Sequence, residues 1–503
     1  MKKFTRRDFL KTAALTAAGL TLPRILSRAR SAEKPNIIVL VFDAMSARNL
    51  SVYGYPRKTT PNFERFAQRA FVYHAHQSAG NYTTPGTASL LAGTYPWTHR
   101  ALNHGGKIAT PLAARNIFQQ IGADYQRYAF TQNSWANIFL NQFQEEIDVL
   151  LPPRSFETLS PFISGEALPD GVSGYQALDS FLFSKSEVSA SLLFGAADKL
   201  YWRKLQESAK NKNYPRGLPE MVTAPFYFET ASLFDGLQAF AKTFQPPFFA
   251  YLHVFPPHEP YRPTREFFNH FKDGWNAPEK PVHRFVQSPN TEQRLNDGRL
   301  NYDRFIANLD AEFGRLMDTF EEQNLFENSY IVLTSDHGDM FERGERGHST
   351  PLLYDAVIHA PLLISAPGKS QRTDIHAPTS GVDLLPTLLK LAGQEIPAWS
   401  EGLVLPGLGG EENPNRAIFS VEAKQNSAFT PLTKATIAMR KGKYKLIYYT
   451  GYEAQDTFEL YDMENDPEEM KDSYAENDSR AKALREELLS ALEESNQRLK
   501  EIY

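Results

Sequence analysis

The chain has 503 residues, of which 42% are hydrophobic and 22% charged, so it can bury a large core and is neither disordered nor fibrous. Its formal net charge is -5, and residues 1–32 hold eight Lys or Arg and one Asp, so the remaining chain carries -12. That acidic balance argues against a general nucleic-acid-binding protein but is compatible with a local basic pocket for a small anionic substrate. The sequence has no cysteine and therefore no disulfide.

Residues 1–32 have the pattern of a twin-arginine signal peptide. TRRDFLK at Thr5–Lys11 carries the arginine pair, and a short apolar run closed by Pro23 and a small-residue stretch ending near Ala32 follow it. A membrane anchor is the alternative, but the run is short of the roughly 20 apolar residues that a span requires. We therefore expect cleavage, export of the folded protein to the periplasm, and no stable membrane span afterwards.

Strand-like and helix-like segments alternate along the mature chain, which is typical of an α/β domain. Asn36–Phe42 is a continuous apolar run of the kind found in buried parallel strands, and Asp43 follows it directly. A carboxylate at the carboxyl end of such a strand lies where open α/β sheets bind their ligands. Further strands are predicted at Phe248–Phe255, Tyr330–Asp336 and Pro361–Ser365, and helices at Thr59–Phe71 and Tyr302–Gln323.

The segment Thr83–Gly93 reads TTPGTASLLAG. Pro85 fits the first turn of a helix, and Thr83 or Thr84 is then predicted to cap that helix, where free N–H groups and the helix dipole favour an anion. The plain interpretation is a capped helix without catalytic role, because capping threonines are common. The functional interpretation makes Thr83 a nucleophile beside a bound phosphate or sulfate.

Residues 150–245 are irregular and rich in aromatic residues, Pro and Ser, and we interpret them as an insertion at the active-site rim that controls substrate choice. After the strand at Phe248–Phe255, the loop PPHEPY places His258 where an imidazole can contact a substrate oxygen or protonate a leaving group. Taken alone, His258 more often has a structural role, and His348 is open to the same two interpretations. His253, inside the strand, is interpreted as a packing residue.

The segment TSDHGDMFERGERGH, Thr334–His348, contains the second cluster of polar residues. Asp336 and His337 are adjacent at the end of a predicted strand, so both side chains can reach one metal ion. With Asp43 and Thr83 they offer four ligands of mixed oxygen and nitrogen type. Such a set suits one divalent ion, Mn²⁺ or Zn²⁺ before Ca²⁺.

The pattern changes from about Asn415 onwards. AIFSVEA, ATIAMR and YKLIYYT are predicted as short antiparallel strands, and the charged run Asp472–Tyr503 as an amphipathic terminal helix whose charges form a solvated face. The sequence therefore predicts a catalytic domain over residues 33–410 and a small subdomain over residues 411–503.

Several of these segments occur together, in order, in one known family. KPNIIVLVFDAMSARNLSVYGY, TTPGTASLLAGTYPWTH, PHEPY, TSDHGD with a later GH, DLLPTLLKLAG and ELYDMENDPEE resemble the sulfatase-like branch of the alkaline phosphatase superfamily over essentially the whole mature chain. The resemblance implies an α/β/α sandwich with a large mixed sheet, followed by a small antiparallel sheet and helix. It also implies Asp43, Asp336 and His337 as metal ligands, Thr83 as nucleophile and metal ligand, and His258 and His348 as substrate contacts.

Three positions depart from motifs of that family. Its sulfatases carry a Cys or Ser, converted to formylglycine, where this chain has Thr83, and an Arg where it has Thr87; many carry a second Asp where it has Ala44. No formylglycine can therefore form, and the residues are similar to those of the phosphodiesterase and phosphonate hydrolase members. We expect a metal-dependent hydrolase that cleaves phosphate or phosphonate esters.

Three alternatives stay open at this point. The first is a sulfatase that uses threonine, and the second is a transferase that passes a phospho-alcohol headgroup to a glycan or lipid. The third is a non-catalytic binding protein of the same fold, which the metal content of the purified protein would separate from an enzyme. The small anionic substrate and the oligomeric state cannot be identified from the sequence.

Overall fold

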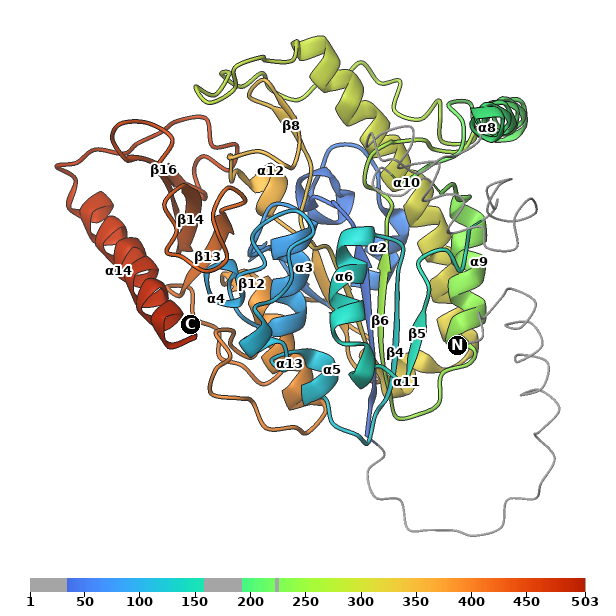
Figure 1. Ribbon diagram of the computed structural model, residues 1–503, viewed down its shortest axis with the longest axis horizontal. Helices are drawn as coiled ribbons and strands as arrows, with labels where there is room; N and C mark the ends of the chain where they lie inside the picture. The colour runs from blue at the N-terminus through green and yellow to red at the C-terminus, as the bar shows by residue number, and fades with distance from the viewer. Residues whose placement is uncertain (1–33, 158–191, 222–225, 503) are drawn as a thin grey trace, which may run out of the picture.

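The structure is a computed structural model that describes residues 34–157, 192–221 and 226–502 (Figure 1). The predicted signal peptide and the middle of the predicted insertion lie outside the described residues. Within them, an eight-stranded mixed sheet forms the centre of the molecule, with the strand order β11-β2-β10-β7-β1-β6-β4-β5. The strands are β1 (Asn36–Phe42), β2 (Phe71–Tyr73), β4 (Gln126–Thr131), β5 (Val149–Leu151), β6 (Phe248–Val254), β7 (Ser329–Thr334), β10 (Leu362–Ser365) and β11 (Thr373–Ile375).

The central strand β1 explains why its sequence is an unbroken apolar run. Ile38, Leu40 and Phe42 pack into the hydrophobic core on one face of the sheet. Ile37, Val39 and Val41 pack into the core on the other face. Both faces are therefore buried, which removes the polar alternation of a half-exposed strand.

Helices cover both faces of this sheet, so the predicted α/β/α sandwich is confirmed. One layer contains α2 (Pro61–Ala67), α9 (Thr230–Ala241) and α10 (Glu292–Glu322), and the other contains α3 (Thr83–Ala92), α5 (Ile117–Gln120), α6 (Ser134–Gln142) and α13 (Leu384–Leu391). The predicted helix at Tyr302 begins ten residues earlier, at Glu292, because the Thr291 side chain caps it there. The first turns of α10 precede the apolar residues on which the prediction was based.

The predicted insertion is described only in part. Helix α8 (Leu192–Lys212) lies at the periphery, whereas α9 belongs to the helical layer of the sheet (Figure 1). The role of this insertion at the rim stays a prediction.

The C-terminal part forms a second, smaller sheet of four antiparallel strands followed by a long helix, as expected. Strands β13 (Ala417–Glu422), β14 (Ala435–Lys441), β15 (Tyr444–Thr450) and β16 (Thr457–Asp462) pair in sequence order, and α14 (Ser479–Ile502) lies beside them (Figure 1). Strand β16 was not predicted. Successive residues of β15 point to opposite faces of the sheet, and Leu446 and Ile447 pack into two different hydrophobic cores. Both faces of this sheet are therefore buried. The domain boundary at residue 410 stays a prediction.

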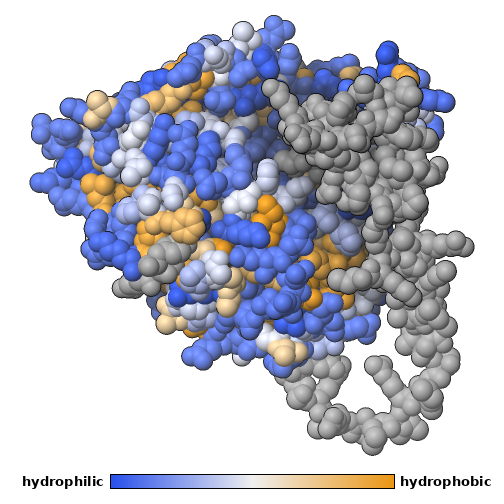
Figure 2. Space-filling view, viewed as in Figure 1, coloured by the Kyte–Doolittle hydropathy of each residue, from blue (hydrophilic) through white to orange (hydrophobic). Residues whose placement is uncertain are grey.

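Buried charges join this small sheet to the rest of the molecule. Lys445 on β15 has no exposed side-chain area, and its Nζ lies 2.8 Å from Asp355 Oδ1, on α12 (Asp355–Ile358), and 2.7 Å from Glu469 Oε1. All three side chains are buried, so the cluster of Lys445, Asp355 and Glu469 is an internal link rather than part of a surface. The face of the molecule shown in Figure 2 is mostly hydrophilic, with apolar side chains in separate small patches.

Candidate active site

The candidate site lies at the carboxyl ends of the three central strands. Strand β1 pairs in parallel with both neighbours, so that Val41 lies opposite His253 on β6 and opposite Thr334 on β7. Parallel strands in register end at the same edge of a sheet. The segments that follow β1 and β7 therefore bring Asp43 and Asp336 together from positions 293 residues apart.

Asp43, Asp336 and His337 form one compact buried group. One ligand atom from each lies within 4.8 Å of the others, and none of the three side chains is exposed. His337 Nε2 is 3.4 Å from Asp43 Oδ1 and 3.7 Å from Asp336 Oδ2. The Nδ1–H of His337 donates to Gly338 O at 2.9 Å, which leaves Nε2 facing the carboxylates.

The carboxylates and imidazoles of this group shift each other's pKa values. Burial lowers the pKa of His337, but the Asp336 and Asp43 carboxylates outweigh it and raise that pKa to about 9. Burial raises the pKa of Asp43, yet the neighbouring imidazoles of His253 and His337 hold it well below the usual range. Within the part of the chain that the structure describes, no Lys or Arg forms an ion pair with either carboxylate.

These residues fit a divalent metal ion. Asp43 Oδ1 is buried and has no hydrogen-bond partner among the described residues, which is costly unless another group satisfies it. A set of carboxylate oxygens and an imidazole nitrogen suits Mn²⁺ or Zn²⁺ better than Mg²⁺. The residues at this site therefore fit one divalent metal ion.

Thr83 lies beside this group at the start of α3. Tyr82 is the N-cap and Thr83 the first helical residue, so the prediction that Thr83 or Thr84 caps the helix is wrong. Thr83 Oγ1 is 3.5 Å from His337 Nε2. A Cβ on Gly86 would lie 2.1 Å from Asp336 O, so a glycine is needed for α3 to approach the end of β7 this closely.

Two further residues of the site were not predicted. Asn133 caps α6 through Oδ1, which accepts from Trp135 N and Ala136 N, and its Nδ2 therefore faces inward, donating to Asp43 Oδ2 and, at 3.1 Å, to Thr83 Oγ1. Thr87 donates to Asp336 Oδ2 at 3.2 Å. An Asn before a helix and after an apolar strand is the sequence signal that could have identified Asn133.

His253 is placed differently from its prediction. It was interpreted as a packing residue, but its Nε2 lies 3.4 Å from Asp43 Oδ2 and 3.9 Å from Asp336 Oδ2. The prediction failed because β6 is buried on both faces, so the sequence does not show which side chain at its end faces the site.

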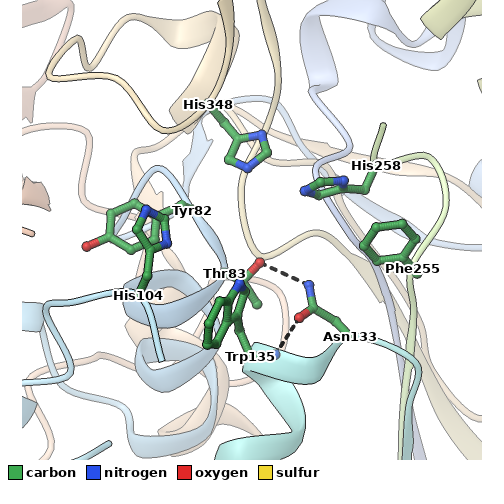
Figure 3. A pocket seen from close by; sticks show the side chains of 8 residues that line it. All are labelled: Tyr82, Thr83, His104, Asn133, Trp135, Phe255, His258 and His348. Atoms are coloured by element: carbon green, nitrogen blue, oxygen red, sulfur yellow. Dashed lines mark hydrogen bonds between the residues drawn. The ribbon is translucent and has the colours of Figure 1, made fainter. Parts of the chain in front are cut away.

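Above Thr83 lies a small cavity of about 40 Å³. Figure 3 shows His258 and His348 on the side of the cavity opposite Thr83, with their ring centroids 4.8 Å apart. Both histidines thus lie at the cavity above Thr83, and their role as substrate contacts stays a prediction. The cavity is lined by Tyr82, Thr83, His104, Asn133, Trp135, Phe255, His258 and His348.

The two histidines above Thr83 differ in their environment. His258 Nδ1–H donates to Glu259 O at 2.8 Å, so its Nε2 is the nitrogen left for a ligand. His348 Nδ1 lies 3.4 Å from Asp339 Oδ1. Burial lowers the pKa of His348, with His337 adding to that effect, so the His348 imidazole is held towards its neutral form.

The comparison with protein families agrees with this geometry. Residues 35–394 match the sulfatase family. The chain belongs to the sulfatase family. Residues 344–498 match the C-terminal region of N-sulphoglucosamine sulphohydrolase, and residues 3–23 match the twin-arginine translocation signal sequence. The predicted signal and export to the periplasm are thereby confirmed. No helix in the described ranges is long and apolar enough to cross a membrane.

The similar proteins include sulfatases and a phosphonate monoester hydrolase. The choline-sulfatase of Rhizobium meliloti (strain 1021) is 24% identical over 466 residues, 87% of this chain and 82% of that protein. The ulvan-active sulfatase of Formosa agariphila is 26% identical over 380 residues, 73% of this chain and 64% of that protein. The phosphonate monoester hydrolase of Agrobacterium radiobacter has a similar structure, with a TM-score of 0.63, 19% identity, and coverage of 92% of this chain and 96% of that one.

Family and geometry together make the protein a sulfatase-family hydrolase that acts on ester bonds. The reported sequence relatives are named for sulfate esters, and a solved structure of similar fold is named for phosphonate monoesters. The family alone therefore leaves open which kind of ester this chain cleaves.

Proposed function

We propose that the protein hydrolyses phosphate or phosphonate esters with Thr83 as the nucleophile. The observation that carries the proposal is the position of Thr83 Oγ1, which lines the cavity and lies 3.5 Å from His337 Nε2. In this cysteine-free chain the hydroxyl cannot become formylglycine. An unmodified hydroxyl forms an ester that water must then cleave, which is the usual course of phosphoryl-transfer enzymes.

Asp43, Thr83, Asp336 and His337 are the proposed ligands of one divalent ion, with Mn²⁺ or Zn²⁺ favoured and Ca²⁺ as the third choice. When bound, such an ion lowers the pKa of a coordinated hydroxyl and neutralises charge on the transferring group. Asn133 holds the Thr83 oxygen through its Nδ2–H, so the nucleophile has a fixed direction before substrate arrives.

The reaction has two steps. The Thr83 oxygen attacks phosphorus, the bond to the ester alcohol breaks, and His258 or His348 donates a proton to the leaving oxygen. Water then attacks the phospho-threonine, which releases phosphate or phosphonate and returns the hydroxyl of Thr83. Both imidazoles line the cavity above Thr83, and the lowered pKa of His348 makes it the weaker candidate for the acid.

A sulfuric ester is the second candidate substrate, and the names of the relatives favour it, since both reported sequence relatives are sulfatases. A threonine sulfate ester lacks the hemiacetal route by which formylglycine expels sulfate. For this reason we expect slower turnover of sulfate than of phosphate esters.

A substrate panel tests the proposal. The mature protein, loaded with Mn²⁺ or Zn²⁺, is assayed with aryl phosphate monoesters, phosphate diesters, phosphonate monoesters and sulfates that share one leaving group. We expect kcat/KM for at least one phosphorus ester to exceed that for the sulfate. Turnover of the sulfate alone would establish the second candidate instead.

A further inference from the structure

His253 is buried beside the candidate metal ligands, and one of its two ring nitrogens has no hydrogen bond. Its side chain is not exposed, and its Nε2 has no hydrogen-bond partner in the described part of the chain. Two carboxylate oxygens lie near that nitrogen, Asp43 Oδ2 at 3.4 Å and Asp336 Oδ2 at 3.9 Å. A buried, unsatisfied imidazole nitrogen aimed at two carboxylates requires an explanation.

The distances from His253 are close to those of His337, which belongs to the candidate metal group. Imidazole and carboxylate ligands lie about 2.0–2.2 Å from Zn²⁺, which separates neighbouring ligand atoms by about 3.0–3.5 Å. His253 Nε2 is 3.4 Å from Asp43 Oδ2, and His337 Nε2 is 3.4 Å from Asp43 Oδ1, both within that range. Their distances to Asp336 Oδ2 are longer, 3.9 Å and 3.7 Å, and similar to each other. The two imidazoles thus lie at comparable distances from the two carboxylates.

A hydrogen bond behind His253 accounts for a free electron pair on Nε2. His253 Nδ1 lies 3.1 Å from the Tyr251 hydroxyl. If Nδ1–H donates to that hydroxyl oxygen, the proton of the neutral imidazole has an acceptor. That tautomer leaves Nε2 unprotonated and turned towards the carboxylates.

Charge balance favours the same arrangement. A divalent ion balances the charges of Asp43 and Asp336, and a neutral imidazole adds a ligand without adding charge to a fully buried place. Thr87, at the position where the family motif has an arginine, is also neutral, so no fixed cation from that position competes with an ion.

From these observations we propose that His253 is a protein ligand of the divalent ion, so that two imidazoles and two carboxylates hold it together with the Thr83 hydroxyl. The proposal rests on the metal-dependent function proposed above. In the competing arrangement, Nε2 of His253 carries a proton and donates it to Asp43, and only one imidazole contacts the ion.

The test counts nitrogen ligands directly. The mature wild-type protein is loaded with Mn²⁺, and pulsed electron paramagnetic resonance measures how many imidazole nitrogens couple to the ion. We expect two in the wild type and one in His253→Gln, with Mn²⁺ affinity lowered about 100-fold, the upper range for loss of groups that only orient a ligand. His258→Ala is the matched control, because it removes a nearby histidine of the cavity and should leave the count at two.

Zinc X-ray absorption on the wild-type protein gives the same count without a variant, so failure of His253→Gln to fold does not leave the question open. One coupled imidazole in the wild type, by both methods, would overturn the role of His253 and leave the proposed function intact. A wild-type protein that binds no divalent ion would instead contradict the proposed function itself.

Discussion

Two buried clusters of charge in this molecule have opposite construction. In the C-terminal cluster, Lys445 Nζ contacts carboxylate oxygens of Asp355 and Glu469 at 2.8 and 2.7 Å, so the chain supplies its own counter-charge. In the candidate metal cluster of Asp43, Asp336 and His337, the two carboxylates have no Lys or Arg partner in the described ranges, and Asp43 Oδ1 has no hydrogen bond there.

The difference separates a structural charge cluster from one that can bind an ion. Burial alone does not distinguish the two clusters, since both are almost fully removed from solvent. Burial raises the pKa of Asp355, but the Lys445 ammonium outweighs it and lowers that pKa below the usual range. A cation that belongs to the chain fixes the structure, whereas carboxylates without one favour binding a cation from solution.

The largest effect is expected at Thr83. Thr83→Ala removes the proposed nucleophile and leaves both carboxylates and His337, so we expect kcat to fall by about 10⁴-fold or more with metal content unchanged. Thr83→Ser should retain partial activity. Mass spectrometry of a quenched reaction should find the added phosphoryl group on the peptide that contains Thr83. Full activity of Thr83→Ala would refute the mechanism.

Removing the internal cation should break the C-terminal cluster. Lys445→Met removes the closest counter-charge of two buried carboxylates and leaves Asp355, among the described residues, only the ion pair with Arg440 Nη1 at 4.0 Å. We expect the free energy of unfolding to fall by about 3–5 kcal/mol. Lys441→Met is the control on the same sheet, because Lys441 pairs with Glu487 near the surface and should cost less than about 1 kcal/mol. Equal losses in the two variants, measured by urea unfolding, would contradict the distinction.

Binding of an added cation at the candidate metal cluster should stabilise the protein. For an ion at 100 times its Kd, binding stabilises the folded state by about 2.7 kcal/mol, so Mn²⁺ should raise the Tm of metal-free protein. Asp43→Asn should abolish the shift. Asp310→Asn should preserve it, since Asp310 is a buried carboxylate that accepts from Asn62 N and Phe63 N away from the site. A shift that persists in Asp43→Asn, measured by thermal unfolding, would place the ion elsewhere.

The smallest effect concerns a buried histidine outside both clusters. Burial lowers the pKa of His99 to about 3, while an unfolded histidine titrates near 6.5. Between these pH values, the His99 side chain binds a proton in the unfolded state but not in the folded state. The free energy of unfolding is therefore unaffected by His99 above pH 6.5 and decreases as the pH falls below it. At pH 5 the expected loss is about 2 kcal/mol.

His99→Asn should reduce this loss, because an amide can accept the Ala101 N–H that His99 Nδ1 accepts now and does not titrate. Free energies of unfolding at pH 7 and pH 5 measure the difference. A variant as sensitive to pH as the wild type would show that other groups cause the loss.

The parts of the site that could be predicted from sequence depend on local rules. Apolar runs that end in a carboxylate indicated β1 and Asp43, and β7 and Asp336, and the parallel pairing of these strands then brought them together. The helix at Thr83 followed from Pro85, although its cap is Tyr82, which no cap propensity indicates.

The remaining parts depend on contacts between distant segments. Asn133 reaches the site only because β4 pairs with β6, and nothing near residue 133 in the sequence reports that strand order. Lys445 and Asp355 are 90 residues apart, so their ion pair could not be predicted from local patterns. For the same reason, the strand at β10 was predicted without its antiparallel direction, and the edge strand β11 was not predicted.

The backbone at Ala44 has an evolutionary consequence. Its φ of 58° is left-handed, a conformation that costs alanine energy and that Asp and Asn adopt more readily. Its N–H donates to Asp336 Oδ1, and its carbonyl oxygen accepts from Tyr302, so the turn is held by groups other than the Ala44 side chain. If one codon changed so that Asp replaced Ala44, the new residue would occupy a backbone that already has the left-handed conformation. A third carboxylate could therefore be acquired without rearrangement of the turn.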